Sequence, residues 1–148
     1  MKVSTVLWAV AVLLLAATGQ ANLLTNGGFE VDQDNNGVPD GWGAWADTGA
    51  IAPWRTDAAH AFDGENYVEL TTGVWAVAFA HDNPVTAGET YYLSAMVRTP
   101  PDGTGAGAGL KFEFYGGLNK ATPLGEVPIF FETTEEWTEH TVTPVAPE

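Results

Sequence analysis

Hydrophobic and polar residues alternate with a period of two over much of the chain from Asn66 onward. This period is typical of a β-strand with one buried face, whereas an amphipathic helix repeats its apolar residues at i, i+3, i+4 and i+7. After residue 21 no stretch keeps the helical pattern over three turns. The sequence therefore predicts an all-β protein.

The strand pattern recurs in six segments, separated by turns that are rich in Gly and Pro. The predicted strands are residues 66–72, 74–81, 90–99, 110–115, 127–133 and 137–143, with the first two joined near Gly73. In the clearest strand, residues 90–99, the core face consists of Tyr91, Leu93, Ala95 and Val97. Pro128 donates no ladder hydrogen bond, which places the fifth strand at an edge. Short strands at this spacing predict a β-sandwich or jelly roll.

The first 21 residues resemble a secretory signal peptide. Lys2 supplies a positive charge, an apolar run follows from Val3 to Ala17, and Gly19 and Ala21 are the small residues that precede a cleavage site. A membrane anchor is the alternative, but about 15 apolar residues are fewer than the roughly 20 that span a bilayer. We expect cleavage after Ala21, a secreted or cell-envelope protein, and no membrane insertion once the signal is removed.

Composition restricts the chemistry of the 148-residue chain. It has 5 basic and 19 acidic residues, a net charge of -14, and no cysteine. The acidity argues against nucleic acid as a partner, since a phosphate backbone would be repelled. The absence of cysteine excludes disulfides and thiolate-ligated zinc. The length corresponds to one domain, which we place at residues 22–148.

Residues 32–40 form the sharpest local motif, Asp-Gln-Asp-Asn-Asn-Gly-Val-Pro-Asp. Its oxygen-bearing side chains alternate along the loop, and Gly37 stands where the chain must turn sharply, as calcium loops require. The expected ligands are Asp32, Asp34, Asn36 and Asp40, with the carbonyl of Val38. Gly43 stands where an EF-hand has its bidentate Glu, so the loop is not an EF-hand. The alternative is a turn whose side chains bond to their own backbone.

Five segments together resemble secreted carbohydrate-binding modules of families four, nine and twenty-two. They are Asn22–Glu30, Pro39–Trp42, Phe62–Leu70, Ala87–Arg98 and Trp137, in the family's order. The resemblance implies a galactose-binding-like jelly roll, polysaccharide or oligosaccharide as the ligand, and a catalytic domain elsewhere in a longer chain. It also implies a structural calcium held in part by Glu30. The family's closing strands have no counterpart after Pro144, and Met96 stands where the family usually has Trp.

Aromatic residues supply both a core and a sugar-binding surface, because sugar rings stack on flat side chains. We expect Trp42, Tyr91, Phe112, Phe114 and Trp137 to be buried. The expected ligand-facing set is Trp75, Phe79, Tyr92, Arg98, Glu113 and Tyr115, which alternate away from the aliphatic positions. The alternative is that Trp75 and Phe79 pack inside while the neighbouring Ala residues face outward.

No motif points to catalysis. Ser94 is the only serine after residue 21 and lies within a strand, and the three histidines have no metal-binding spacing. Glu69, Glu113 and Glu139 lie on different strands, so carboxylate pairs for glycoside hydrolysis stay open. We therefore expect a noncatalytic binding module. The alternatives are a calcium-stabilised envelope or adhesion module without glycan specificity, and a small glycanase or lyase.

Overall fold

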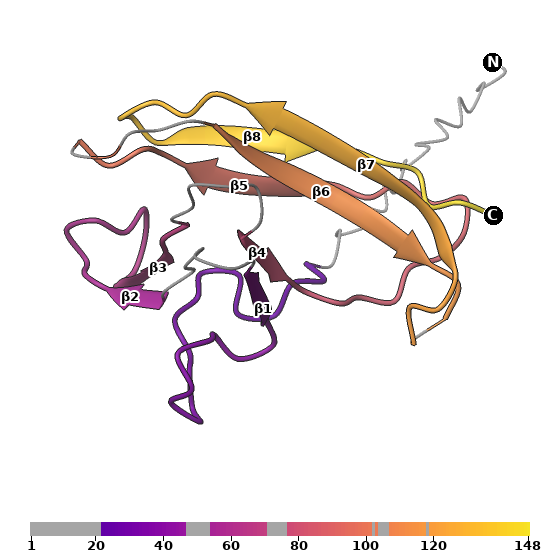
Figure 1. The fold of residues 1–148 in the computed structure, drawn as a ribbon, viewed down its shortest axis with the longest axis horizontal. Helices are drawn as coiled ribbons and strands as arrows, with labels where there is room; N and C mark the ends of the chain where they lie inside the picture. Colours follow the sequence, from indigo (N-terminus) through magenta and orange to yellow (C-terminus); the bar gives the residue numbers. More distant parts are fainter. Residues whose placement is uncertain (1–21, 47–53, 71–76, 102, 104–106, 118) are drawn as a thin grey trace, which may run out of the picture.

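The computed structural model describes residues 22–46, 54–70, 77–101, 103, 107–117 and 119–148, and this part of the chain is all-β with no helix. Nothing in these ranges is a helix with the length and apolar character needed to cross a membrane. The strands form four antiparallel pairs (Figure 1). Their bounds are β1 Gly43–Ala46, β2 Trp54–Thr56, β3 Asn66–Val68, β4 Val77–Ala80, β5 Leu93–Val97, β6 Ala108–Tyr115, β7 Pro123–Phe131 and β8 Thr138–Val142. The all-β prediction is confirmed.

Strands β6 and β7 form the longest pair. Their register runs from Ala108 opposite Phe131 to Tyr115 opposite Pro123, with an irregularity between Phe114 and Tyr115. The alternation predicted for residues 110–115 is present, but β7 begins four residues before the predicted Val127. Pro and Gly have low β-propensity, so the sequence does not indicate a strand in this part of the chain. Pairing with β6 overrides that low propensity. Pro128 lies in β7, and among the described residues β7 pairs with β6 alone. A strand that pairs on one side only is an edge strand, which is where Pro128 was expected.

Strands β5 and β8 form a second ribbon, shorter than the segments predicted at residues 90–99 and 137–143. Pairing continues beyond it, because Thr90 bridges Val145 and the carbonyl of Glu89 accepts from the N–H of Ala146 at 2.9 Å. This extra pairing buries Ala146 to 2% exposure. The predicted strand at residues 90–99 is thus interrupted at Tyr91 and Tyr92 rather than continuous.

The two ribbons pack face to face as two layers, and Figure 1 shows the β6–β7 ribbon crossing the β5–β8 ribbon. The ring of Phe131 on β7 stacks on the ring of His140 on β8, with centroids 3.5 Å apart. Phe131 shares its face with Phe114, and His140 shares its face with Val142, so the apolar faces of both ribbons meet. Phe114 and Val142 are each 5% exposed, so each ribbon contributes a buried side chain from its apolar face.

The amino-terminal half contributes two small strand pairs, β1 with β4 and β2 with β3. The sequence did not predict β1 or β2, because these strands of four and three residues are too short to show a period. It also joined residues 66–72 to residues 74–81 as neighbouring strands, whereas β3 pairs with β2 and β4 pairs with β1. The turn expected near Gly73 lies outside the described residues.

Trp54 and Trp42 anchor these pairs through their indole N–H groups, which donate to the carbonyls of Phe29 at 2.7 Å and Asn26 at 3.0 Å. The ring of Trp137 meets the ring of Phe62 at 5.6 Å and joins this half to the β5–β8 ribbon. The aromatic core of the structure is smaller than the sequence predicted. Phe114 is buried, but Trp42, Tyr91, Phe112 and Trp137 are half-buried. Layers of two strands are too narrow to cover large rings on every side.

Replacing Phe114 with Ala tests this packing. Truncating a buried Phe costs about 3–5 kcal/mol through lost transfer energy and the cavity left behind. The matched control is Tyr92→Ala, since Tyr92 is 57% exposed and surface changes stay within about 0.5 kcal/mol. Urea unfolding of both variants measures the difference. Equal losses in the two variants would contradict the two-layer core.

Candidate functional site

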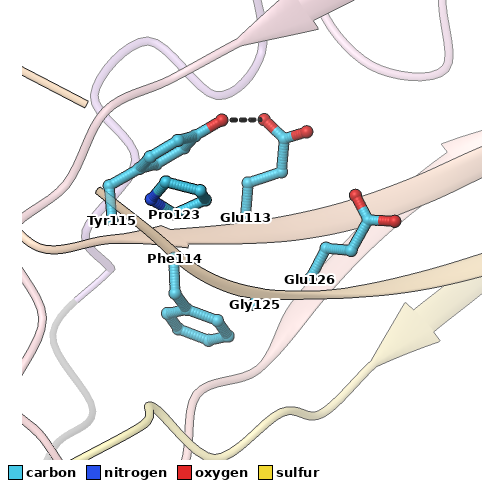
Figure 2. Close-up of a pocket in the computed structure, with 6 residues that line it drawn as sticks. All are labelled: Glu113, Phe114, Tyr115, Pro123, Gly125 and Glu126. Carbon is cyan, nitrogen blue, oxygen red and sulfur yellow. Dashed lines mark hydrogen bonds between the residues drawn. The ribbon is translucent and has the colours of Figure 1, made fainter. Parts of the chain in front are cut away.

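The outward face of the β6–β7 ribbon carries a cluster of polar and aromatic side chains. Because side chains alternate across a strand, Lys111, Glu113 and Tyr115 point away from the buried Phe114. Figure 2 shows this directly, with Tyr115 and Glu113 on one side of β6 and the Phe114 ring on the other. Glu126 lies opposite Glu113 in the register and joins the same face. The sheet geometry therefore builds one surface from two strands.

Hydrogen bonds and ion pairs connect these side chains. The Tyr115 hydroxyl donates to Glu113 Oε2 at 3.1 Å. The Lys111 ammonium pairs with Glu113 and, at 3.5 Å, with Glu126. The Lys111 hydrogen bond lowers the pKa of Glu113, and the same bond raises the pKa of Lys111. The pKa of Tyr115 is raised by its hydrogen bond to Glu113, so the phenol keeps its proton at neutral pH.

A hollow of about 180 Å³ lies beside this cluster. It is lined by Glu113, Phe114, Tyr115, Pro123, Gly125 and Glu126 (Figure 2). Pockets that enclose a small molecule measure roughly 300–1,000 Å³. This hollow is smaller, so it suits a ligand that lies along the ribbon and places only part of itself in the depression. We call Lys111, Glu113, Tyr115, Pro123 and Glu126 the β6–β7 outer face.

The structure does not bring all six predicted ligand residues together. Glu113 and Tyr115 are neighbours, but the Tyr92 hydroxyl donates to Glu139 Oε1 at 3.4 Å, on the face of the β5–β8 ribbon opposite to His140. Arg98, just after β5, continues the alternation on that same face. Arg98 packs over the Trp137 ring at 5.0 Å and donates to the carbonyl of His60, which are contacts within the fold. Trp75 lies outside the described residues. Phe79 lies in β4, and its side chain is likewise outside the described part.

Three residues of the β6–β7 outer face were missed by the sequence analysis: Lys111, Pro123 and Glu126. The alternation of residues 110–115 already placed Lys111 beside Glu113 and Tyr115. Glu126 and Pro123 could not be found in the same way, because the predicted strand began at Val127 and its partner in the sheet was unknown. Register between strands is a tertiary property that no single segment encodes.

The predicted cation loop brings three carboxylates together. Asp32, Asp34 and Asp40 each offer an oxygen, and these oxygens lie within 4.8 Å of one another. Backbone N–H groups of the loop also use them: Asp32 Oδ2 accepts from Gly37 at 3.0 Å, and Asp34 Oδ1 accepts from Asn36 at 3.2 Å. The donor set is made of hard oxygens, which is the kind calcium prefers. Both the cation loop and the self-bonded turn are compatible with these contacts.

Asn36 and Glu30, the other expected ligands, have different surroundings. Asn36 Oδ1 accepts from the N–H of Val38 at 2.7 Å, inside the loop. The Glu30 carboxylate lies outside the group of three and accepts from the N–H of Glu65 at 3.1 Å and from Asn66 Nδ2 at 2.6 Å. Glu30 therefore ties the amino-terminal segment to the start of β3. A side chain at Gly64, whose φ is +70°, would collide with this carboxylate.

Comparisons with known proteins add no family or function to what the geometry of the site indicates. No family model, no curated protein and no solved structure matches this chain.

The Glu113 pKa provides a test of the outer face. Because its folded pKa is lowered below the ordinary value of 4.5, ionised Glu113 stabilises the fold above that pH, and this contribution is lost as the pH falls through the folded pKa. Lys111→Met should raise the pKa toward 4.5, and Tyr115→Phe should raise it less, since Lys111 makes the larger contribution. Titration of the side-chain carboxyl by NMR measures both. A wild-type pKa at or above 4.5 would contradict the arrangement.

Proposed function

We propose that this protein is a noncatalytic carbohydrate-binding module whose ligand lies along the β6–β7 outer face. The observation that carries the proposal is the Tyr115 ring, held beside Glu113 and Lys111 at the rim of an open hollow. A polysaccharide offers apolar C–H faces that stack on an aromatic ring and hydroxyl groups that both donate and accept hydrogen bonds. The outer face provides partners for both.

The resemblance of five segments to carbohydrate-binding modules supports the same function. It also supports a jelly-roll type of sandwich for the two-layer arrangement of the β6–β7 and β5–β8 ribbons. In this proposal the ligand is a polysaccharide or oligosaccharide, and the module serves a catalytic domain in a longer chain. The signal-like segment before Asn22 supports export to the cell envelope or the medium.

The proposal of a noncatalytic role rests on the state of Glu113. A glycosidase acid must hold its proton near neutral pH, which requires a raised pKa. Lys111 lowers the pKa of Glu113 instead, so Glu113 is not a proton donor of that kind. The Glu113 carboxylate is better suited to accept hydrogen bonds from sugar hydroxyls than to protonate a leaving oxygen.

We also propose that calcium stabilises the module through Asp32, Asp34, Asn36 and Asp40, and that Glu30 helps to hold a separate structural calcium, as the family resemblance implies. A divalent ion would neutralise three carboxylates that lie within 4.8 Å of one another, and would fix the loop that leads into β1. The chemistry it supplies is structural. Residues 22–42 contain no Lys or Arg that would offset the acidic charge of the loop.

The binding proposal predicts different results for two tyrosines, the half-buried Tyr115 and the exposed Tyr92. Tyr115→Ala removes the stacking ring and should weaken retardation by soluble β-glucan or xylan by about tenfold or more, the scale of one lost stacking contact. Tyr92→Ala removes a ring from the other ribbon, away from the β6–β7 outer face, and should leave retardation unchanged. Affinity gel electrophoresis measures both, with release of reducing sugar as the control for catalysis. A folded wild-type protein that no neutral polysaccharide retards would favour the adhesion alternative, and sugar release would favour the enzyme.

The calcium proposal predicts a metal-dependent stability. At a calcium concentration of about 100 Kd, the free energy of unfolding should rise by about 2.7 kcal/mol over that in chelator. Asp34→Ala should abolish most of this increase, because it removes one of the three converging carboxylates. The control is Glu135→Ala, an exposed acidic residue in the turn before β8, which should keep the full increase. Equal melting temperatures in calcium and chelator would leave the self-bonded turn as the explanation of the loop.

A further inference from the structure

Two carboxylates face each other across the ladder in the middle of the β6–β7 outer face. Glu113 and Glu126 are direct partners in the register, a position in which like charges are unfavourable. Lys111 is shared between them. All three side chains remain between 41% and 59% exposed, so they are available to a ligand.

The charged groups in and around this pair have a net negative charge. Lys120 lies near enough to act on Glu113, but its ammonium is already paired with Asp82 at 2.8 Å. The cluster thus contains two ammonium groups and three carboxylates, for a net charge of one negative unit. The whole chain adds to this with its net charge of -14. An approaching anion meets repulsion both from the cluster and from the protein as a whole.

We infer that the Glu113–Glu126 pair makes the β6–β7 outer face selective for uncharged glycans over polyuronates. The inference rests on the proposed function and names the residues that set its specificity. Sugar hydroxyls can donate to the two carboxylates, whereas the carboxylate of a uronic acid cannot. Tyr115 and Lys111 both bond to the Glu113 carboxylate and hold it on this face. Discrimination therefore comes from a repulsive element as well as from attractive contacts.

Reversing one charge of the pair tests the inference. The measured quantity is the ratio of the association constants for polygalacturonate and for neutral β-glucan, obtained by affinity gel electrophoresis of the full chain at low salt. Glu126→Lys should raise this ratio by roughly three- to tenfold, the size of one or two exposed charge contacts, and Glu126→Gln should raise it less. Added salt should reduce the gain, because exposed charges are screened.

Glu135→Lys is the matched control, because it changes the net charge of the chain by the same amount outside the β6–β7 outer face. Its ratio should stay near the wild-type value. The inference is overturned if Glu126→Lys leaves the ratio unchanged, if Glu135→Lys raises it equally, or if the wild type binds polygalacturonate as tightly as β-glucan. A wild type that binds neither glycan overturns the proposed function, and the inference with it. Binding of β-glucan with an unchanged ratio overturns the inference alone.

Discussion

The contact between the apolar faces of two β-ribbons is the constraint on which the rest of this structure depends. A two-stranded ribbon is marginal alone, and a hydrophobic face against another layer is what stabilises it. Phe131 stacks on His140 across the two ribbons, and the buried Phe114 and Val142 lie on the same two apolar faces. Because side chains alternate, burying Phe114 forces Glu113 and Tyr115 outward. The core therefore decides which residues a ligand meets.

The sequence predicted what depends on alternation and missed what depends on pairing. Leu110, Phe112 and Phe114 showed their period plainly, so the direction of Glu113 and Tyr115 was predictable. The strand pairs were not, because the sequence pattern does not say that β3 pairs with β2 rather than β4. The same gap explains the predicted ligand set. Tyr92 and Tyr115 both alternate away from aliphatic neighbours, yet they lie on the outward faces of two different ribbons.

The two candidate sites differ in how their residues are assembled. The cation loop is local: Asp32, Asp34 and Asp40 converge through turns within nine residues, so the motif alone could place them. The β6–β7 outer face is not local, since Glu113 and Glu126 meet through the register of two strands. This strand pairing also determines the electrostatics of the face, because Lys111 forms ion pairs with both carboxylates and lowers the pKa of Glu113.

Pro128 has a consequence for the protein in concentrated solution. Strand β7 has nine residues and exposes Leu124 and Phe130, and a long edge of this kind is a template on which another chain can add a strand and begin to aggregate. Pro128 offers no N–H to such a strand, and Glu126 places a charge two residues away. The same strand that presents the outer face is thus protected against self-association along the edge that, among the described residues, has no strand partner.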